Sequence, residues 1–267
     1  MSALPLRSAA RSRRGLLGLF RKEPQPERCA VAPEGQRLYA IGDIHGRADQ
    51  LERLLDRLEA DAKPAEEEPC FVFLGDYVDR GPEVQRTLDI LCRLPERFQR
   101  LIFLKGNHEE ALLTFLDLGV GLEPWLAHGG EATLMSYGVA RPRGGFAAGD
   151  AEELREELRE KLPQEHLTFL RNLEMSYRCG ELFFVHAGVR PGVPLEAQLA
   201  EDLLWIREPF LSSQEDYGAV IVHGHSITQL PEQRPNRIGV DTGAYATGVL
   251  TAAVITPREL FFLSSAP

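Results

Sequence analysis

The sequence predicts an α/β fold with a functional site at the ends of its strands. Short apolar runs of strand type occur six times after residue 37, and each run passes into a tight polar turn that contains glycine. Amphipathic segments with helical spacing lie between the first three runs. The chain has 267 residues, of which 43% are hydrophobic and 26% are charged. This composition is typical of a globular protein with one large or two small domains.

The first part of the pattern alternates strands with helices. The runs at 38–41, 71–74 and 101–104 are the first three predicted strands. Residues 51–58 place leucines at positions i, i+3, i+4 and i+7, which gives a helix one apolar face, and Pro82 stands at the start of a second helix. This order predicts sheets flanked by helices, with ligands bound at the carboxyl ends of the strands.

The second part begins with a stretch of another kind. Residues 110–180 are predicted to be mostly helical, and we expect them to form an insertion that shapes or covers the cleft. Residues 1–36 are predicted to be a flexible basic tail in front of a single domain at 37–267. The remaining three predicted strands follow the insertion, at 182–185, 219–222 and 238–240.

Charge is divided unevenly along the chain. Residues 1–37 hold eight Lys and Arg against three Glu, so the other residues hold 22 of the 30 basic and 37 of the 40 acidic side chains. Proteins bind the phosphate backbone of nucleic acids through clustered Lys and Arg. The acidic body therefore argues against nucleic acid as the main partner.

No segment of the sequence suggests a membrane span or a secreted domain held by disulfides. The longest apolar stretches, 71–74 and 248–255, fall far short of the roughly 18 residues that a membrane helix needs. The four cysteines lie far apart, without a Cys-x-x-Cys pair. We therefore predict a cytoplasmic protein with no membrane span.

Histidines gather at the ends of the predicted strands. Five of the seven follow an apolar run, and carboxylates and an amide stand beside them. Oxygen and nitrogen ligands without thiolates suit Mn, Fe, Zn or Mg. The group holds more ligands than one ion needs, which predicts a two-metal centre that binds a phosphoryl group. The candidates are Asp43, His45, Asp76, Asp79, Asn107, His108, His186, His223 and His225.

The polar turns also match a known set of motifs. They read Gly-Asp-Ile-His-Gly at 42–46, Gly-Asp-Tyr-Val-Asp-Arg-Gly at 75–81, Gly-Asn-His-Glu at 106–109, His-Ala-Gly at 186–188 and Gly-His at 224–225. Together they resemble the signature of the phosphoprotein phosphatase family of serine/threonine phosphatases, in the bacterial and phage-type branch of the calcineurin-like metallophosphoesterases. The resemblance covers most of the chain. It implies a metallophosphoesterase sandwich, in which central mixed β-sheets are flanked by α-helices and carry a helical insertion.

The resemblance implies a centre of two divalent metal ions, Mn foremost, with Fe, Zn or Mg as alternatives. One ion would be held by Asp43, His45 and Asp76, and the other by Asp76, Asn107, His186 and His225. A hydroxide that bridges the ions would attack phosphorus directly, without an amino-acid nucleophile. His223 competes with His225 for a ligand position. The resemblance favours His225, and His223 stays open as a ligand or as a residue that contacts one.

The resemblance also assigns catalytic and substrate-binding roles. His108 would protonate the leaving alkoxide while Asp79 orients its imidazole. Arg80 would bind phosphate oxygens through its forked guanidinium, and Arg207 is a second candidate for this role. Lys105 stands where many family members carry Arg, so this third candidate keeps the charge and loses the bidentate geometry.

The motif at 77–81 resembles protein serine/threonine phosphatases more than dinucleoside polyphosphate hydrolases. We therefore expect a phosphorylated protein or peptide as the substrate. Two alternatives remain open: a symmetrical dinucleoside tetraphosphate hydrolase and a phosphoesterase of broad specificity. A non-catalytic scaffold that binds a phosphorylated partner would show the loss of a metal ligand, and the sequence retains all of the implied ligands.

Overall fold

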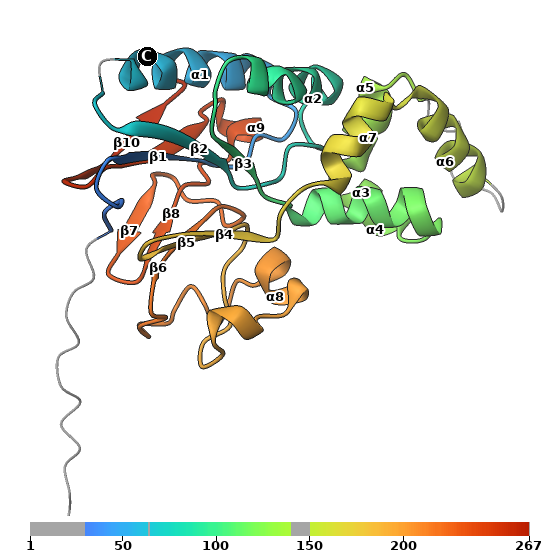
Figure 1. Ribbon diagram of the computed structural model, residues 1–267. Coiled ribbons are helices and arrows are strands. Elements are labelled where there is room, and N and C mark those ends of the chain that lie inside the picture. The colour runs from blue at the N-terminus through green and yellow to red at the C-terminus, as the bar shows by residue number, and fades with distance from the viewer. Residues whose placement is uncertain (1–29, 64, 140–149, 267) are drawn as a thin grey trace, which may run out of the picture.

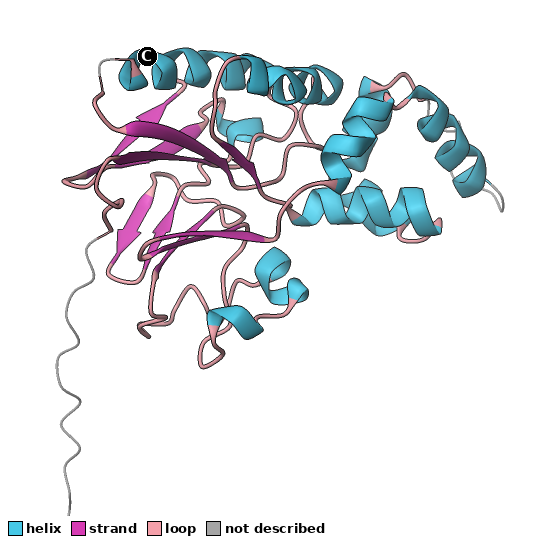
Figure 2. Cartoon of the chain, in the orientation of Figure 1, coloured by secondary structure: helices cyan, strands magenta, loops and turns pink. Residues whose placement is uncertain are grey.

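The computed structural model of the chain describes residues 30–63, 65–139 and 150–266. Two five-stranded mixed sheets pack face to face, and helices lie along the outer side of the first sheet (Figures 1 and 2). Residues 1–29 of the predicted tail lie outside the described residues, so the division between tail and domain stays a prediction.

The first sheet consists of β1 (Gln36–Ile41), β2 (Glu68–Phe73), β3 (Leu101–Phe103), β9 (Thr251–Ile255) and β10 (Leu260–Ser264). Its strand order is β10-β9-β1-β2-β3. The first three strands are parallel and are joined by α1 (Ala48–Ala62) and α2 (Val84–Arg93). β9 lies antiparallel between β1 and β10, so the last two strands of the chain complete the first sheet.

Side chains of the first sheet alternate between two cores. In β1, Tyr39 and Ile41 pack on the side of the helices, whereas Leu38 and Ala40 face the second sheet. The leucines at 51–58 of α1 lie in the first of these cores, as their helical spacing predicts. The central strands are therefore buried on both faces, which explains why they read as continuous apolar runs.

The second sheet consists of β4 (Ser176–Cys179), β5 (Leu182–Val185), β6 (Val220–His223), β7 (Glu232–Arg234) and β8 (Arg237–Gly239). Its order is β4-β5-β6-β8-β7, with parallel central strands and an antiparallel strand at either edge. Apolar side chains such as Phe184 and Val222 lie in the core between the sheets. On the other face, Phe183 and Ile221 pack with Phe210, which follows α8 (Ala200–Trp205).

Between β3 and β4, the described part of the chain is mostly helical, and these helices stand beside the sandwich (Figure 1). They are α3 (Asn107–Leu118), α4 (Leu122–Trp125), a π-helical turn (Leu126–Gly130), α5 (Glu131–Ser136), α6 (Asp150–Lys161) and α7 (Gln164–Arg171). The short elements elsewhere are two 3-10 turns (Leu94–Glu96 and Leu195–Ala197) and α9 (Ala244–Thr247). In the part of the chain that the structure describes, no helix is long and apolar enough to cross a bilayer.

The predicted fold class is confirmed, since the structure is an α/β sandwich of mixed sheets flanked by helices. The six apolar runs form β1, β2, β3, β5, β6 and β8. One element differs from the expectation for residues 110–180. β4 falls inside that stretch because it pairs with β5 across a tight turn at Gly180, whose φ of +59° suits a glycine.

Candidate metal centre

The turns after five parallel strands bring buried polar side chains together. β1, β2 and β3 supply them from the first sheet, and β5 and β6 supply them from the second. Carboxyl ends of parallel strands meet at one edge, which explains why residues far apart in the sequence are neighbours here. The six candidate metal ligands are each at most 7% exposed, and they are Asp43, His45, Asp76, Asn107, His186 and His225.

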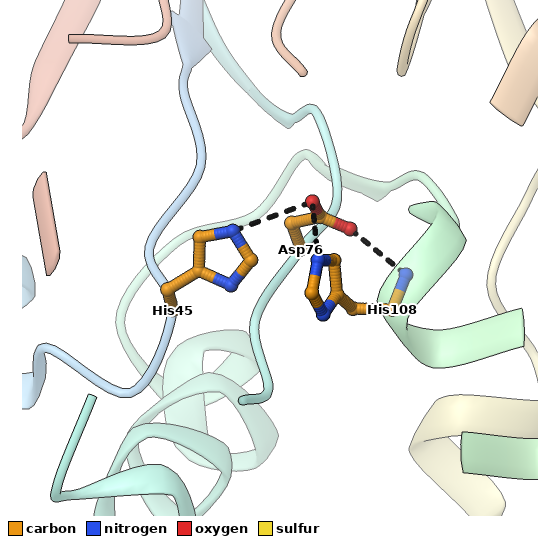
Figure 3. A group of neighbouring side chains, drawn as sticks. All are labelled: His45, Asp76 and His108. Atoms are coloured by element: carbon orange, nitrogen blue, oxygen red, sulfur yellow. Dashed lines mark hydrogen bonds and ion pairs between the residues drawn. The ribbon is translucent and has the colours of Figure 1, made fainter. Parts of the chain in front are cut away.

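The Asp76 carboxylate lies at the middle of this cluster. Its Oδ2 is 3.4 Å from His45 Nε2 and 3.9 Å from His108 Nε2 (Figure 3), and its Oδ1 is 3.5 Å from His186 Nε2. Asp76 therefore belongs to two groups of possible ligand atoms. Within each group, the ligand atoms lie within 4.8 Å of one another. One group contains His45 and His108, and the other contains His186 and His225.

Two glycines let the carboxylates lie against the backbone. A Cβ atom on Gly106 would stand 2.1 Å from Asp76 Oδ1, and one on Gly224 would stand 2.1 Å from Asp43 Oδ1. Any side chain at either position would displace a candidate ligand. These contacts give a physical reason for glycine at the start of two of the sequence motifs.

The imidazoles are held with one ring nitrogen directed at the cluster. Nδ1 of His45 donates to the carbonyl of Val78 at 2.8 Å, and Nδ1 of His186 donates to the carbonyl of Leu74 at 2.8 Å. A proton fixed on Nδ1 leaves Nε2 as the free electron pair of a neutral ring. Burial lowers the pKa of His45 to about 3 and lowers the pKa of His186 as well. Burial, followed by the charge of His186, lowers the pKa of His225 to about 2.

Three buried carboxylates, Asp43, Asp76 and Asp241, stand near one another. Burial, and then the charges of Asp241 and Asp76, raise the pKa of Asp43 well above its usual range. Burial raises the pKa of Asp241 to about 6. Burial also opposes ionisation of Asp76, but an ionised Asp76 would attract the surrounding imidazoles in their protonated forms, and this interaction outweighs burial and lowers the pKa of that carboxyl. Crowded carboxylates beside neutral imidazoles and an amide are a donor set that fits divalent metal ions.

The remaining metal-ligand candidates are placed as follows. Asn107 Oδ1 lies 2.9 Å from His186 Nε2. Both carboxylate oxygens of Asp43 accept the backbone N–H of His225, at 3.1 and 3.0 Å. The group that contains His45 and Asp76 has His108, and not Asp43, as its third member. His223 belongs to neither group that contains Asp76; its ring packs against Phe210, with the centroids 5.0 Å apart.

His108 and Asp79 form a buried pair. Nδ1 of His108 donates to Asp79 Oδ2 at 2.7 Å. Burial alone would lower the pKa of His108, but the charge of Asp76 and the hydrogen bond to Asp79 raise it above the usual value. The helical stretch holds Asp79 in turn, because Trp125 Nε1 donates to its Oδ2 at 2.9 Å and Thr133 Oγ1 donates to its Oδ1 at 2.5 Å. The sequence analysis did not identify Trp125 or Thr133 as residues of the site.

The three candidate phosphate-binding side chains have different surroundings. The guanidinium of Arg80 reaches the cluster, with NH1 3.0 Å from His45 Nε2 and NH2 3.0 Å from His108 Nε2. Arg207 lies near the second group, where its NH1 donates to Ser226 Oγ at 3.1 Å. Lys105 is paired with Glu110, with 3.0 Å between Nζ and Oε2.

Glu109 supports the cluster from below. Its carboxylate accepts the backbone N–H groups of Gly106, Asp76, Tyr77 and Val78 at 2.7 to 3.2 Å. Burial, followed by the charge of Asp76, raises its pKa to about 7. The residue is the last of the Gly-Asn-His-Glu motif, so the signal was present in the sequence without a role attached to it.

The geometry agrees with a comparison against known families. Residues 36–247 match the calcineurin-like phosphoesterase family. The chain belongs to this family, and the groups of side chains that share Asp76 are its candidate metal ligands.

Two curated relatives carry dinucleoside tetraphosphatase names. The chain is 33% identical over 155 residues to the symmetrical bis(5'-nucleosyl)-tetraphosphatase of Legionella pneumophila strain Corby, which covers 57% of this chain and 45% of that protein. The matched part is thus less than half of that relative. The chain is 25% identical over 232 residues to the asymmetrical bis(5'-nucleosyl)-tetraphosphatase PrpE of Anoxybacillus flavithermus, covering 79% and 87% of the two chains.

A solved structure shares the fold. The crystal structure of a candidate diadenosine tetraphosphatase superposes with a TM-score of 0.61 at 21% identity, over 88% of this chain and 96% of that chain. The wider family named by the sequence motifs is confirmed. The relatives described here are tetraphosphatases by name, so they do not support the narrower resemblance to serine/threonine protein phosphatases.

Proposed function

We propose that the protein hydrolyses bis(5'-nucleosyl) tetraphosphates in a metal-dependent reaction. The observation that carries phosphoester hydrolysis is the Asp76 carboxylate shared by two groups of imidazole nitrogens. The names of the curated relatives support the substrate class. This proposal takes up the alternative left open by the sequence and places it ahead of protein dephosphorylation.

The residues that would hold the ions are those that the motifs indicate. We assign Asp43, His45 and Asp76 to one ion and Asp76, Asn107, His186 and His225 to the other, with Mn²⁺ as the first candidate and Fe, Zn or Mg as alternatives. His108 is left out of the ligand set because its pKa is raised, unlike those of His45 and His186, and a protonated Nε2 has no free electron pair for a metal ion. Bound ions would supply Lewis-acid chemistry, which lowers the pKa of water and offsets phosphate charge.

The chain itself would bind the phosphoryl group and supply a proton. Arg80 is proposed to bind phosphoryl oxygens, since its two terminal nitrogens already face the cluster. Arg207 is proposed to help from the side of His225, where Ser226 holds it. His108 would protonate the leaving oxygen through Nε2, because Asp79 accepts from Nδ1 and the raised pKa of His108 keeps a proton available.

A pocket beside His108 could accommodate a nucleobase. Its volume is about 250 Å³, and its wall is mostly apolar, with Trp205 and Pro124 at its sides and Asn107 next to the cluster. Trp205 is 44% exposed, so its indole offers a surface for stacking. Flat aromatic bases bind to such surfaces without sequence preference. The pocket therefore supports a substrate with a base near the leaving group.

The motif at 77–81 does not distinguish among phosphoester substrates once its side chains are placed. Tyr77 and Val78 are fully buried, and the Tyr77 hydroxyl donates to the carbonyl of Leu104 at 2.7 Å. Only Asp79 and Arg80 reach the cluster, where they act on groups common to all phosphoesters. A phosphorylated peptide stays the second candidate substrate.

A cytoplasmic location is part of this proposal. Cys70, Cys92 and Cys179 are free thiols, the state that a reducing compartment maintains. Burial raises the pKa of Cys70 and of Cys92 to about 11, so neither thiol is primed for reaction at neutral pH.

The test compares two substrates on one preparation. The protein with added Mn²⁺ is given diadenosine tetraphosphate or a phosphoserine/phosphothreonine peptide, and Asp76→Asn serves as the inactive control. Water and diadenosine tetraphosphate yield two ADP by symmetrical cleavage, or ATP and AMP by asymmetrical cleavage. Preferential nucleotide cleavage supports the proposal, and chromatography of the products shows which bond breaks. Turnover of the peptide alone would reinstate the protein phosphatase.

A further inference from the structure

Arg80 is a long side chain whose guanidinium is held in one place. Its NH1 and NH2 atoms face His45 and His108 as described, and its Nε donates to the carbonyl of His128 at 3.4 Å. Its backbone N–H donates to the carbonyl of Gly129 at 3.0 Å. These contacts hold the base and the edges of the side chain, but none of them covers the flat face of the guanidinium.

Tyr245 covers that face. The Arg80 Cζ atom lies 4.8 Å from the centre of the Tyr245 ring. The same ring meets His45 edge-on, with centroids 5.5 Å apart and planes at 86°. The electron-rich face of an aromatic ring attracts a cation, and stacking on that face does not use the N–H groups at the guanidinium edge.

The short helix α9 fixes Tyr245 from two sides. Gly243 and Gly248 bound the helix with φ of +66° and +72°, so it begins and ends abruptly. The Gly243 N–H donates to Asp241 Oδ1 at 2.8 Å, and Arg47 NH1 donates to the carbonyl of Ala244 at 2.9 Å. The ring therefore stands on a backbone anchored beside the cluster and at the start of α1.

We propose that Tyr245 is a positioning residue that holds Arg80 ready to bind the phosphoryl group. This inference rests on the proposed function, in which Arg80 contacts phosphoryl oxygens. Arginine loses much rotamer freedom when it is ordered, and a ring that orders it beforehand lowers the cost of binding. No sequence motif used above includes Tyr245.

The test combines ring variants with removal of the guanidinium. We expect Tyr245→Leu to lower kcat/KM for a phosphomonoester and to weaken inhibition by orthovanadate, each by roughly three- to thirty-fold. Tyr245→Phe keeps the ring and should stay within about two-fold of the parent. In an Arg80→Ala background, Tyr245→Leu should have almost no further effect, because the group it acts through is gone.

Controls separate this inference from the proposed function. Leu230→Ala changes another exposed apolar side chain, 75% exposed, and should match the parent. Metal content and thermal unfolding of each variant show whether the cluster and the fold are intact. A loss in Tyr245→Phe as large as in Tyr245→Leu, or a full loss that persists without Arg80, would overturn the positioning role. An intact, metal-loaded parent that cleaves no phosphoester would overturn the proposed function instead.

Discussion

At the scale of single residues, unusual backbone conformations coincide with the candidate site. Among the described residues, the non-glycine residues with positive φ are His45, Asp76, Asp79, Arg80 and His225, with φ between 46° and 68°. Each such conformation costs on the order of 1–3 kcal/mol and persists only where the surroundings enforce it. Here Glu109 binds the Asp76 N–H, and the Asp76 carbonyl accepts the N–H of His45. The backbone is thus held for the sake of side-chain direction.

Replacement of His108 tests the proton donor. We expect His108→Asn to lower kcat by about 10²- to 10⁴-fold on a phosphoserine peptide, whose alkoxide leaving group needs a proton, since general acid catalysis contributes that much. The loss should be far smaller with p-nitrophenyl phosphate, whose leaving group needs no proton. Steady-state rates on both substrates check the prediction. Equal losses on the two would argue for a structural or ligand role of His108.

Removal of the Arg80 side chain should lower kcat/KM much more than removal of the Lys105 side chain. Arg80→Ala removes two charged donors that face the cluster, and we expect kcat/KM to fall roughly 10²- to 10⁴-fold, since such hydrogen bonds contribute about 1.5–3 kcal/mol each. Lys105 is engaged by Glu110, so Lys105→Ala should cost less than about five-fold. The ratio of the two losses, measured on one substrate, is the readout. A larger loss at Lys105 would show that it leaves Glu110 to bind phosphate.

At the scale of elements, the sequence predicted what is local and missed what is remote. Strands followed by glycine turns could be predicted because the apolar run and the polar residues are adjacent in the chain. The supports of Asp79 could not, since Trp125 and Thr133 lie 46 and 54 residues away on helices whose approach no local pattern encodes. Tyr245 was missed for the same reason, because its contact with Arg80 exists only after both sheets have assembled.

The packing of α7 against α2 gives a pH-dependent contribution to stability. His166 of α7 is fully buried between the Tyr137 hydroxyl, 2.9 Å from Nδ1, and Asp89 of α2, 3.2 Å from Nε2. Burial lowers the pKa of His166, although the charges of Asp89 and Glu165 oppose the shift. The unfolded chain therefore takes up this proton more readily, and the contribution is present above about pH 6.5 and lost as pH falls below it.

Denaturation at several pH values checks this contribution. The free energy of unfolding should decrease from pH 7 to pH 5.5 in the parent, and the decrease should be shallower in His166→Gln. Other buried histidines keep part of the slope in both proteins. Parallel slopes for parent and variant would show that His166 does not titrate differently in the folded state.

At the scale of the whole molecule, the candidate centre joins the two sheets. His45, Asp76 and Asn107 follow strands of the first sheet, whereas His186 and His225 follow strands of the second. An ion bound by both sets would link the halves of the sandwich. Ligands that bind only the folded state stabilise it by mass action.

Metal removal should therefore change stability as well as activity. At a free ion concentration of 100 Kd, binding adds about 2.7 kcal/mol, which for a chain of this size raises Tm by roughly 5–10 °C. We expect chelation to abolish hydrolysis and to lower Tm by that amount, and Mn²⁺ to restore both. Asp76→Asn should show little response of Tm to chelation. An unchanged Tm in the parent would mean that the ions do not tie the sheets together.

The position of β9 has a consequence for folding during synthesis. β9 pairs with β1, whose partner on the other side, β2, is synthesised early, whereas β9 is the last but one of the strands in the described part of the chain. Until β9 has been synthesised, one edge of β1 has no partner strand, and unpaired strand edges can pair with other protein chains. The free edge of β1 is therefore paired only after translation has passed residue 255, and until then it exposes the nascent chain to aggregation.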